Sequence, residues 1–263
     1  MDWLQIVVLS LIQGITEFLP VSSSGHLVLP SLLTDWPDQG LAFDVGVHFG
    51  SLLAVIAYFR HELASMLSAT LRLPVTRVYS AEVDQVAKLA LATVPVALVG
   101  FLAKDFIEIN LRTVPVIAGT TIGFALLLWW ADRQPGMQTE ANWQQALFIG
   151  LAQVLALVPG TSRSGITITA ALLLSLNRTT AARFSFLLAI PTIAGAQLLL
   201  TLDLVEQGID RWGELLAGAS LAGLSAYLCI HFFIQLVERT GMLPYVVYRL
   251  ALGSGLFLLV WFG

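Results

Sequence analysis

Cysteine and charge are both scarce in this sequence. Cys229 is the single cysteine, and only 11% of the 263 residues are charged, whereas soluble domains usually carry about 25%. One cysteine excludes an intramolecular disulfide and a cysteine-based metal site. The net charge of −4 and the lack of any basic cluster exclude the positive surface that nucleic-acid binding requires. We therefore expect no nucleic acid among its partners.

Hydrophobic residues are abundant, at 57% of the chain. A soluble domain of this length cannot hide so much apolar surface, whereas lipid accepts apolar side chains. A transmembrane helix needs roughly 20 apolar residues. Six runs of about that length lie at 41–59, 86–103, 113–131, 184–202, 213–236 and 243–262. We predict an all-α integral membrane protein with one membrane domain, 1–263.

Two further apolar runs, 3–19 and 143–158, are interrupted by proline, glycine and serine. Each is followed by a second apolar piece of only 7 to 11 residues, which is too short to cross a bilayer. Non-helical backbone persists at membrane depth only where protein or a wet cavity surrounds it. We therefore predict re-entrant helical hairpins over 3–34 and 143–177. The alternative is a normal crossing followed by a surface loop. No basic residue precedes the first run, so we expect no cleavable signal peptide.

The interrupted segments belong to an internal repeat. A shift of 140 residues aligns Trp3 with Trp143, Gln5 with Gln145, Gln13 with Gln153, Ser22 with Ser162, Ser24 with Ser164 and Gly25 with Gly165. Such matches at one offset indicate a duplication. We predict a first repeat over 1–134 and a second over 135–263, each with one hairpin and three crossings. Three crossings invert the second copy, as in many transporters.

The placement of basic residues predicts the orientation. With six crossings and both termini outside, nine of the 13 basic residues fall on one side, three fall on the other, and Arg163 stays at a hairpin tip. Basic residues favour the cytoplasmic side. We therefore expect outward-facing termini and an outward entrance to the first hairpin. We also expect a large cytoplasmic loop over 60–88, and Arg249 extending to the cytoplasmic interface.

The first interruption carries polar groups that are costly in a membrane and therefore commonly functional. Gln13 and Glu17 are four residues apart on one helix face, and His26 follows at the end of the same segment. Glu17 could orient His26 or hold a divalent cation. The structural alternatives are a cap or interfacial role for Glu17 and a turn hydrogen bond for His26. Asp44 and His48, also four apart, could line an access route or simply lie at the interface.

The second interruption, TSRSG at 161–165, predicts an anion-binding turn. Hydroxyls and the backbone N–H groups of a tight turn that opens a helix favour phosphate oxygens. Arg163 adds a permanently charged, bidentate donor. Alternatively, Arg163 pairs with Glu17 and holds the hairpins together, and both roles could hold in turn.

Together the two interruptions predict phosphoryl transfer, which needs a nucleophile, charge neutralisation and a proton carrier. The nucleophile could be a serine hydroxyl of the first interruption or His26 itself, and the residues alone do not decide between them. Glu17 and His26 are assigned to proton or metal chemistry, and Arg163 to charge neutralisation. The predicted phosphate-binding residues are Ser22, Ser24, Thr161, Ser162, Arg163 and Ser164. The rival function is a transporter or lipid flippase, because inverted repeats support alternating access.

The motifs QGITEFLPVSSSGH at 13–26 and PGTSRSG at 159–165 resemble the two signature motifs of the undecaprenyl-pyrophosphate phosphatase family, also called bacitracin-resistance proteins. The resemblance covers essentially the whole chain in length and segment order. It implies a bacterial inner-membrane enzyme that removes the terminal phosphate from undecaprenyl pyrophosphate, a long-chain prenyl pyrophosphate. The product is the lipid carrier for peptidoglycan and other envelope polymers.

The resemblance also implies residue roles. It maps the acidic motif of the family to Gln13 and Glu17, the Ser/Gly/His motif to Ser22 through His26, and the arginine to Arg163. With the resemblance included, we choose Ser23 over His26 as the nucleophile. Gln13 stands where some members have glutamate, which weakens a two-carboxylate metal site. We therefore expect Mg²⁺ or Ca²⁺ to act mainly with the substrate phosphates, with Glu17 and Gln13 as its protein ligands. The family further implies a periplasm-facing site, and homodimers have been suggested for it.

Overall fold

The computed structural model describes residues 1–263 except 28, 35, 38, 134–135, 208–211 and 263. The described residues form helices and no strand. The α-helices are α1 Trp3–Phe18, α2 Ser23–Leu27, α3 Leu29–Leu33, α4 Gly40–Tyr58, α5 Arg60–Thr76, α6 Ala81–Asn110, α7 Val114–Asp132, α8 Trp143–Gln153, α9 Arg163–Leu173, α10 Arg178–Gln207, α11 Trp212–Thr240 and α12 Leu243–Phe262. A 3₁₀ helix, η1 Val154–Leu157, continues α8.

Six of these helices, α4, α6, α7, α10, α11 and α12, are long and apolar enough to cross a membrane. They coincide with the six apolar runs of the sequence. The prediction of an all-α, multi-pass membrane protein is therefore confirmed.

The two interrupted runs are broken where their prolines and glycines predict. In the first, α1 ends at Phe18 and α2 begins at Ser23; in the second, η1 ends at Leu157 and α9 begins at Arg163. Both runs lack the length of a spanning helix. The non-helical segments 19–22 and 158–162 are called the first tip and the second tip below.

Local structure recurs at the 140-residue spacing. α1 and α8 both begin with a capping box, formed by Asp2 with Gln5 and by Asn142 with Gln145, which satisfies otherwise unpaired N–H groups. Ser22 and Ser162 both have positive φ, at 76° and 71°, which is uncommon for residues other than glycine. The helix pairing also recurs, because α1 packs on α11 as α8 packs on α6.

Small residues let the helices around the first tip pack closely. A Cβ added at Gly50 of α4 would lie 2.0 Å from the carbonyl oxygen of Ala219 in α11. A Cβ added at Gly14 of α1 would lie 2.0 Å from Ser225 Oγ, also in α11. Without a hydrophobic driving force in lipid, close van der Waals packing of this kind holds helices together. It fixes the position of the last turn of α1, which carries Glu17.

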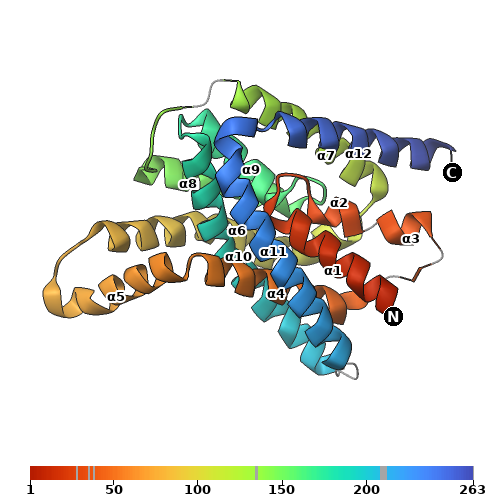
Figure 1. The fold of residues 1–263 in the computed structure, drawn as a ribbon, viewed down its shortest axis with the longest axis horizontal. Helices are drawn as coiled ribbons and strands as arrows, with labels where there is room; N and C mark the ends of the chain where they lie inside the picture. Colours follow the sequence, from red (N-terminus) through yellow and green to blue (C-terminus); the bar gives the residue numbers. More distant parts are fainter. Residues whose placement is uncertain (28, 35, 38, 134–135, 208–211, 263) are drawn as a thin grey trace.

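The segment 60–88 is largely helical rather than an irregular loop. α5 covers Arg60–Thr76 and α6 begins at Ala81, because alanine, leucine and arginine favour helix even where little is buried. α5 and the start of α6 project at one end of the molecule, and both termini lie at the other end (Figure 1).

Candidate active site

The structure brings the two tips into contact. Ser164 Oγ at the start of α9 donates a hydrogen bond of 2.8 Å to the carbonyl oxygen of Leu19 in the first tip. The N–H of Gly160 in the second tip donates to Ser24 Oγ at 3.2 Å. The two polar segments, about 140 residues apart in the chain, therefore form one structural unit.

Glu17 is the centre of this unit. Its carboxylate is almost fully buried, with 8% of the side chain exposed. Gln13 Nε2 and Ser23 Oγ both donate to Glu17 Oε2, at 3.0 and 3.1 Å. The other oxygen, Oε1, accepts from Arg163 Nη2 at 3.3 Å. Four predicted site residues thus meet at one carboxylate, and the predicted alternative of a Glu17–Arg163 ion pair is present.

Arg163 extends from the first residue of α9 toward α1. Besides Glu17, its guanidinium donates to the carbonyl oxygen of Ser185 in α10 at 3.2 Å and lies 5.7 Å from the ring centre of Phe18. Its Nε is buried, with no hydrogen-bond partner among the described residues. A guanidinium inside a membrane domain needs a counter-charge and hydrogen-bond acceptors. Glu17 and Ser185 provide these for the two terminal nitrogens, whereas Nε has no acceptor among the described residues.

His26 does not contact Glu17 through either ring nitrogen. Nδ1 lies 2.6 Å from the carbonyl oxygen of Ser22, and Nε2 lies 2.6 Å from the hydroxyl of Tyr248 in α12. A carbonyl only accepts, so in the neutral ring Nδ1 carries the proton and Nε2 accepts from Tyr248. Orientation of His26 by Glu17, one of the two roles considered for Glu17, is therefore not what the structure has: the turn hydrogen bond considered as the alternative for His26 is present, and α12 supplies the second partner.

His48 of α4 lies near Glu17 Oε2, whereas Arg163 bonds the other carboxylate oxygen, Oε1. Its Nε2 lies 3.7 Å from Glu17 Oε2, while Nδ1 is bonded to the carbonyl oxygen of Asp44 at 2.8 Å. The His48 side chain is 31% exposed, against 8% for Glu17. His48 is therefore the more exposed partner of the buried carboxylate. The sequence left its role open between an access route and an interfacial position.

The four serines predicted to bind phosphate form hydrogen bonds that stabilise the backbone of the two tips. Ser22 Oγ and Ser162 Oγ each accept from the N–H of the glycine three residues later. Each also pairs with a neighbouring serine, Ser24 or Ser164, at 3.1 and 3.3 Å. The protons of Ser162 and Ser164 are both used, because Ser164 donates to Leu19 and Ser162 to Ser164, whereas one of the Ser22 and Ser24 hydroxyls keeps a proton that it can donate to a phosphate. Thr161 Oγ1, by contrast, is buried with no hydrogen-bond partner among the described residues.

Arg249 of α12 is fully buried, so its expected place at the cytoplasmic interface is wrong. Its guanidinium donates to the carbonyl oxygens of Gly160 and Thr161, both at 3.0 Å, of Thr121 at 3.2 Å and of Pro20 at 3.3 Å. Broken helices leave carbonyls without helical partners, and Arg249 bonds three of them, Pro20, Gly160 and Thr161, besides the Thr121 carbonyl inside α7. The sequence carries no sign of this, because an arginine in an apolar run does not reveal how deep it lies.

The donor set around Glu17 suits a hard cation in part. Gln13 Oε1 is buried with no hydrogen-bond partner among the described residues, and Glu17 and Ser23 add oxygens beside it. Mg²⁺ and Ca²⁺ prefer oxygen ligands. The part of the chain that the structure describes holds no group of three histidine, cysteine or acidic side chains placed to bind a metal. Gln13, Glu17 and Ser23 could therefore supply only part of the ligand shell of such a cation.

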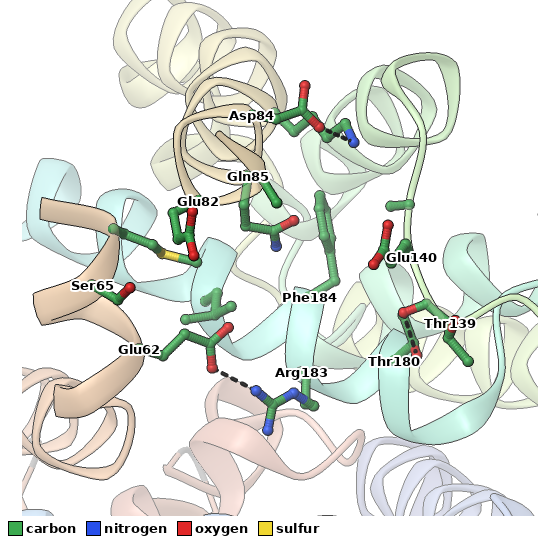
Figure 2. A pocket seen from close by; sticks show the side chains of 15 residues that line it. Glu62, Ser65, Glu82, Asp84, Gln85, Thr139, Glu140, Thr180, Arg183 and Phe184 are labelled. Atoms are coloured by element: carbon green, nitrogen blue, oxygen red, sulfur yellow. Dashed lines mark hydrogen bonds and ion pairs between the residues drawn. The ribbon is translucent and has the colours of Figure 1, made fainter. Parts of the chain in front are cut away.

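A separate cavity of about 440 Å³ lies where α5, α6 and α10 begin (Figure 2). It is crossed by a 2.5 Å ion pair between Arg183 and Glu62 and bordered by the Lys88–Asp84 pair. The cavity is lined by no residue of either tip. The Arg183–Glu62 pair is therefore a reference pair of the same chemistry outside the candidate active site.

Comparison with known proteins identifies the family of this chain. The family described as "Bacitracin resistance protein BacA" matches residues 6–255. The chain is also similar to a protein of Alteromonas mediterranea named "Undecaprenyl-diphosphatase", with 54% identity over 271 residues, covering 100% of this chain and 99% of that protein. The match contains Glu17, Ser23, Arg163 and Arg249. The chain therefore belongs to the bacitracin resistance protein BacA family.

Proposed function

We propose that this protein removes the terminal phosphate of undecaprenyl pyrophosphate where the two tips meet. The observation that carries the proposal is the cluster of Glu17, Ser23 and Arg163, in which a buried carboxylate lies within hydrogen-bond distance of a partly buried hydroxyl and a partly buried guanidinium. The similar protein of A. mediterranea carries the name of this activity. The product, undecaprenyl phosphate, would be recycled as the carrier for peptidoglycan and other envelope polymers, and by family this activity confers bacitracin resistance.

Ser23 is the proposed nucleophile. Its hydroxyl donates to Glu17 Oε2 at 3.1 Å, within the range expected of a nucleophile and its base. Glu17 takes the proton while Ser23 Oγ bonds to the terminal phosphorus and the bond to the bridging oxygen breaks. Undecaprenyl phosphate leaves, and water then hydrolyses the phosphoserine to inorganic phosphate. Ser23 is favoured over His26 because Tyr248 occupies His26 Nε2.

Arg163 is proposed to serve two partners in turn. Before substrate binds, it neutralises Glu17 across 3.3 Å. The terminal phosphate would then attract the guanidinium, whose planar N–H groups match phosphate oxygens. This exchange would free Glu17 to act as a base. The unpaired Thr161 Oγ1 and Arg163 Nε would gain partners at the same time, and Ser22, Ser24, Ser162 and Ser164 would hold the surrounding backbone.

A divalent cation, Mg²⁺ or Ca²⁺, is proposed to bind mainly to the diphosphate of the substrate. Bound there, it would neutralise charge on the phosphates. Gln13 Oε1 and the Glu17 carboxylate would hold it on the protein side. Gln13 also donates to Glu17 and so keeps that carboxylate in place.

The proposed architecture is an inverted repeat in the bacterial inner membrane, with re-entrant hairpins over 3–34 and 143–177. The capping boxes and the two positive-φ serines repeat at the same spacing, which supports the duplication. The boundary between repeats, 134–135, lies outside the described residues. The basic-residue distribution supports termini and active site toward the periplasm, and the termini share one end of the molecule (Figure 1). A homodimer is part of the proposal only by family resemblance.

Purified wild-type protein should release inorganic phosphate from undecaprenyl pyrophosphate in detergent with no membrane gradient. Hydrolysis needs only the cluster around Glu17, whereas a flippase needs two compartments. Phosphate release is measured colorimetrically, and lipid movement is measured in parallel with protein reconstituted in vesicles. Lipid movement without any phosphate release would contradict the proposal and favour the flippase.

Ser23→Ala should lower the rate of phosphate release by roughly three orders of magnitude, because the attacking oxygen is lost. With substrate labelled on the terminal phosphate, acid-quenched wild-type protein should carry the label on Ser23. Ser220→Ala is the matched control, since Ser220 is exposed on α11 and bonds only its own helix. Label on His26, or near wild-type activity of Ser23→Ala, would make His26 or water the nucleophile.

A further inference from the structure

We propose that Arg249 is the positioning residue of this site, which orients the backbone of the second tip so that amide N–H groups at the start of α9 face the terminal phosphate. This inference rests on the proposed function. It assigns a role to α12, which contributes no residue of either sequence motif.

The contacts of Arg249 are all to backbone oxygens of the segments that build the site. One guanidinium joins the first tip through Pro20, the second tip through Gly160 and Thr161, and α7 through Thr121. No ion pair to Arg249 is present among the residues that the structure describes. A side chain that served only to neutralise a carboxylate would have a carboxylate partner, so its role concerns the position of the backbone.

The bonds of Arg249 determine the direction of the neighbouring N–H groups. In a planar trans peptide the C=O and the following N–H point in opposite directions. Arg249 holds the Thr161 carbonyl at 3.0 Å, so the N–H of Ser162 points away from the guanidinium. That N–H, and those of Arg163 and Ser164 in the first turn of α9, have no hydrogen-bond partner within the described chain. Free N–H groups at a helix start bind phosphate oxygens.

Backbone strain at Ser162 supports the same role. Ser162 has φ 71° and ψ 114°, a conformation that a residue other than glycine keeps only where its surroundings impose it. Arg249 holds the carbonyls of the two residues just before Ser162. Ser22 of the first tip has φ 76°, and Arg249 bonds Pro20 two residues before it. In both tips, Arg249 therefore bonds carbonyls that lie one or two residues before the strained serine.

The charge of Arg249 adds to the selectivity for an anion. Arg163 and Arg249 contribute two positive charges to the tips, and Glu17 is the one carboxylate that the described contacts place with them. Binding of a diphosphate would offset this excess. Lysine would keep the charge but not the planar fork, so the two contributions can be separated by substitution.

The test compares Arg249→Lys and Arg249→Gln with wild type by amide hydrogen exchange and by phosphate release. Without substrate, exchange over 158–166 should become faster in both variants while exchange in α4 and α10 stays unchanged. With undecaprenyl pyrophosphate, kcat should fall roughly tenfold or more in Arg249→Lys, with a smaller change in KM, because misplaced groups mainly affect the transition state. The matched control is Arg178→Lys, since Arg178 forms a two-point contact with Asp132 away from the tips.

Wild-type exchange over 158–166 in both variants would overturn the inference, and so would faster exchange spread equally over all helices, which would make Arg249 a general stabiliser. These exchange measurements use no substrate. Absence of phosphate release by the wild-type protein would instead contradict the proposed function and leave the exchange result standing.

Discussion

Arg163→Ala should release phosphate from undecaprenyl pyrophosphate about a thousandfold more slowly than the wild-type protein. The variant loses the guanidinium that is proposed to neutralise the terminal phosphate. It also leaves the buried Glu17 carboxylate without the partner at 3.3 Å, so the carboxylate repels the incoming anion. Gln13 and Ser23 still donate to Glu17, and the fold should therefore persist. Initial rates in detergent at saturating substrate measure the effect.

Arg183→Ala is the matched control for this prediction. Arg183 also pairs with a glutamate, Glu62 at 2.5 Å, but lies at the separate cavity in Figure 2. Its side chain is 44% exposed, and exposed ion pairs contribute little to stability. The rate of phosphate release by Arg183→Ala should stay within about twofold of the wild-type rate. A folded Arg163→Ala protein that retains near wild-type activity would exclude Arg163 from the chemistry.

The parts of the fold that follow from composition were predictable from the sequence. Six apolar runs became six helices of spanning length, because lipid requires continuous apolar helices. The breaks also followed, since Pro20 and Pro159 each stand beside a cluster of serine and glycine that disfavours helix. By contrast, Pro95 and Pro191, in largely apolar surroundings, lie inside α6 and α10. The Glu17–Arg163 contact was predictable because two charges buried in one membrane domain need each other.

The contacts that depend on packing between distant helices were not predictable. His26 pairs with Tyr248, 222 residues away, and an aromatic residue in an apolar run gives no sign of such a partner. Arg249 looked like an interfacial residue because its position along a helix axis does not reveal which face it occupies. His48 was ambiguous for the same reason, since only the packing of α4 beside α1 brings it to Glu17.

The structure also changes the roles that the sequence suggested for the two tips. From sequence, the first tip was assigned proton chemistry and the second phosphate binding. In the structure the two are interlocked through Ser164 with Leu19 and Gly160 with Ser24, and Arg249 braces both. Ser22, Ser24, Ser162 and Ser164 bond each other and the backbone of the tips, whereas Glu17, Ser23 and Arg163 form the cluster for which the chemistry is proposed.

Glu17→Gln should lower the rate of phosphate release by roughly two to four orders of magnitude, because it removes the general base while keeping the shape of the side chain. The glutamine can still accept from Ser23, so Ser23 should stay in position without a group to take its proton. The matched control is Glu62→Gln, which breaks the Arg183 pair and should leave the rate nearly unchanged. Wild-type activity in Glu17→Gln would exclude a carboxylate base and point to water or His26.

The double variant Glu17→Gln, Arg163→Ala tests whether the two residues act as one unit. Their charges lie 3.3 Å apart, and residues in contact commonly show non-additive effects. If Arg163 frees Glu17 by moving to the phosphate, Arg163→Ala should cost less in the Glu17→Gln background than alone, because it then removes only the neutralisation of the phosphate and no longer leaves an unpaired carboxylate that repels the anion. Losses that multiply would instead mean that Glu17 and Arg163 act at independent steps, and their ion pair would then serve only to hold the two tips together.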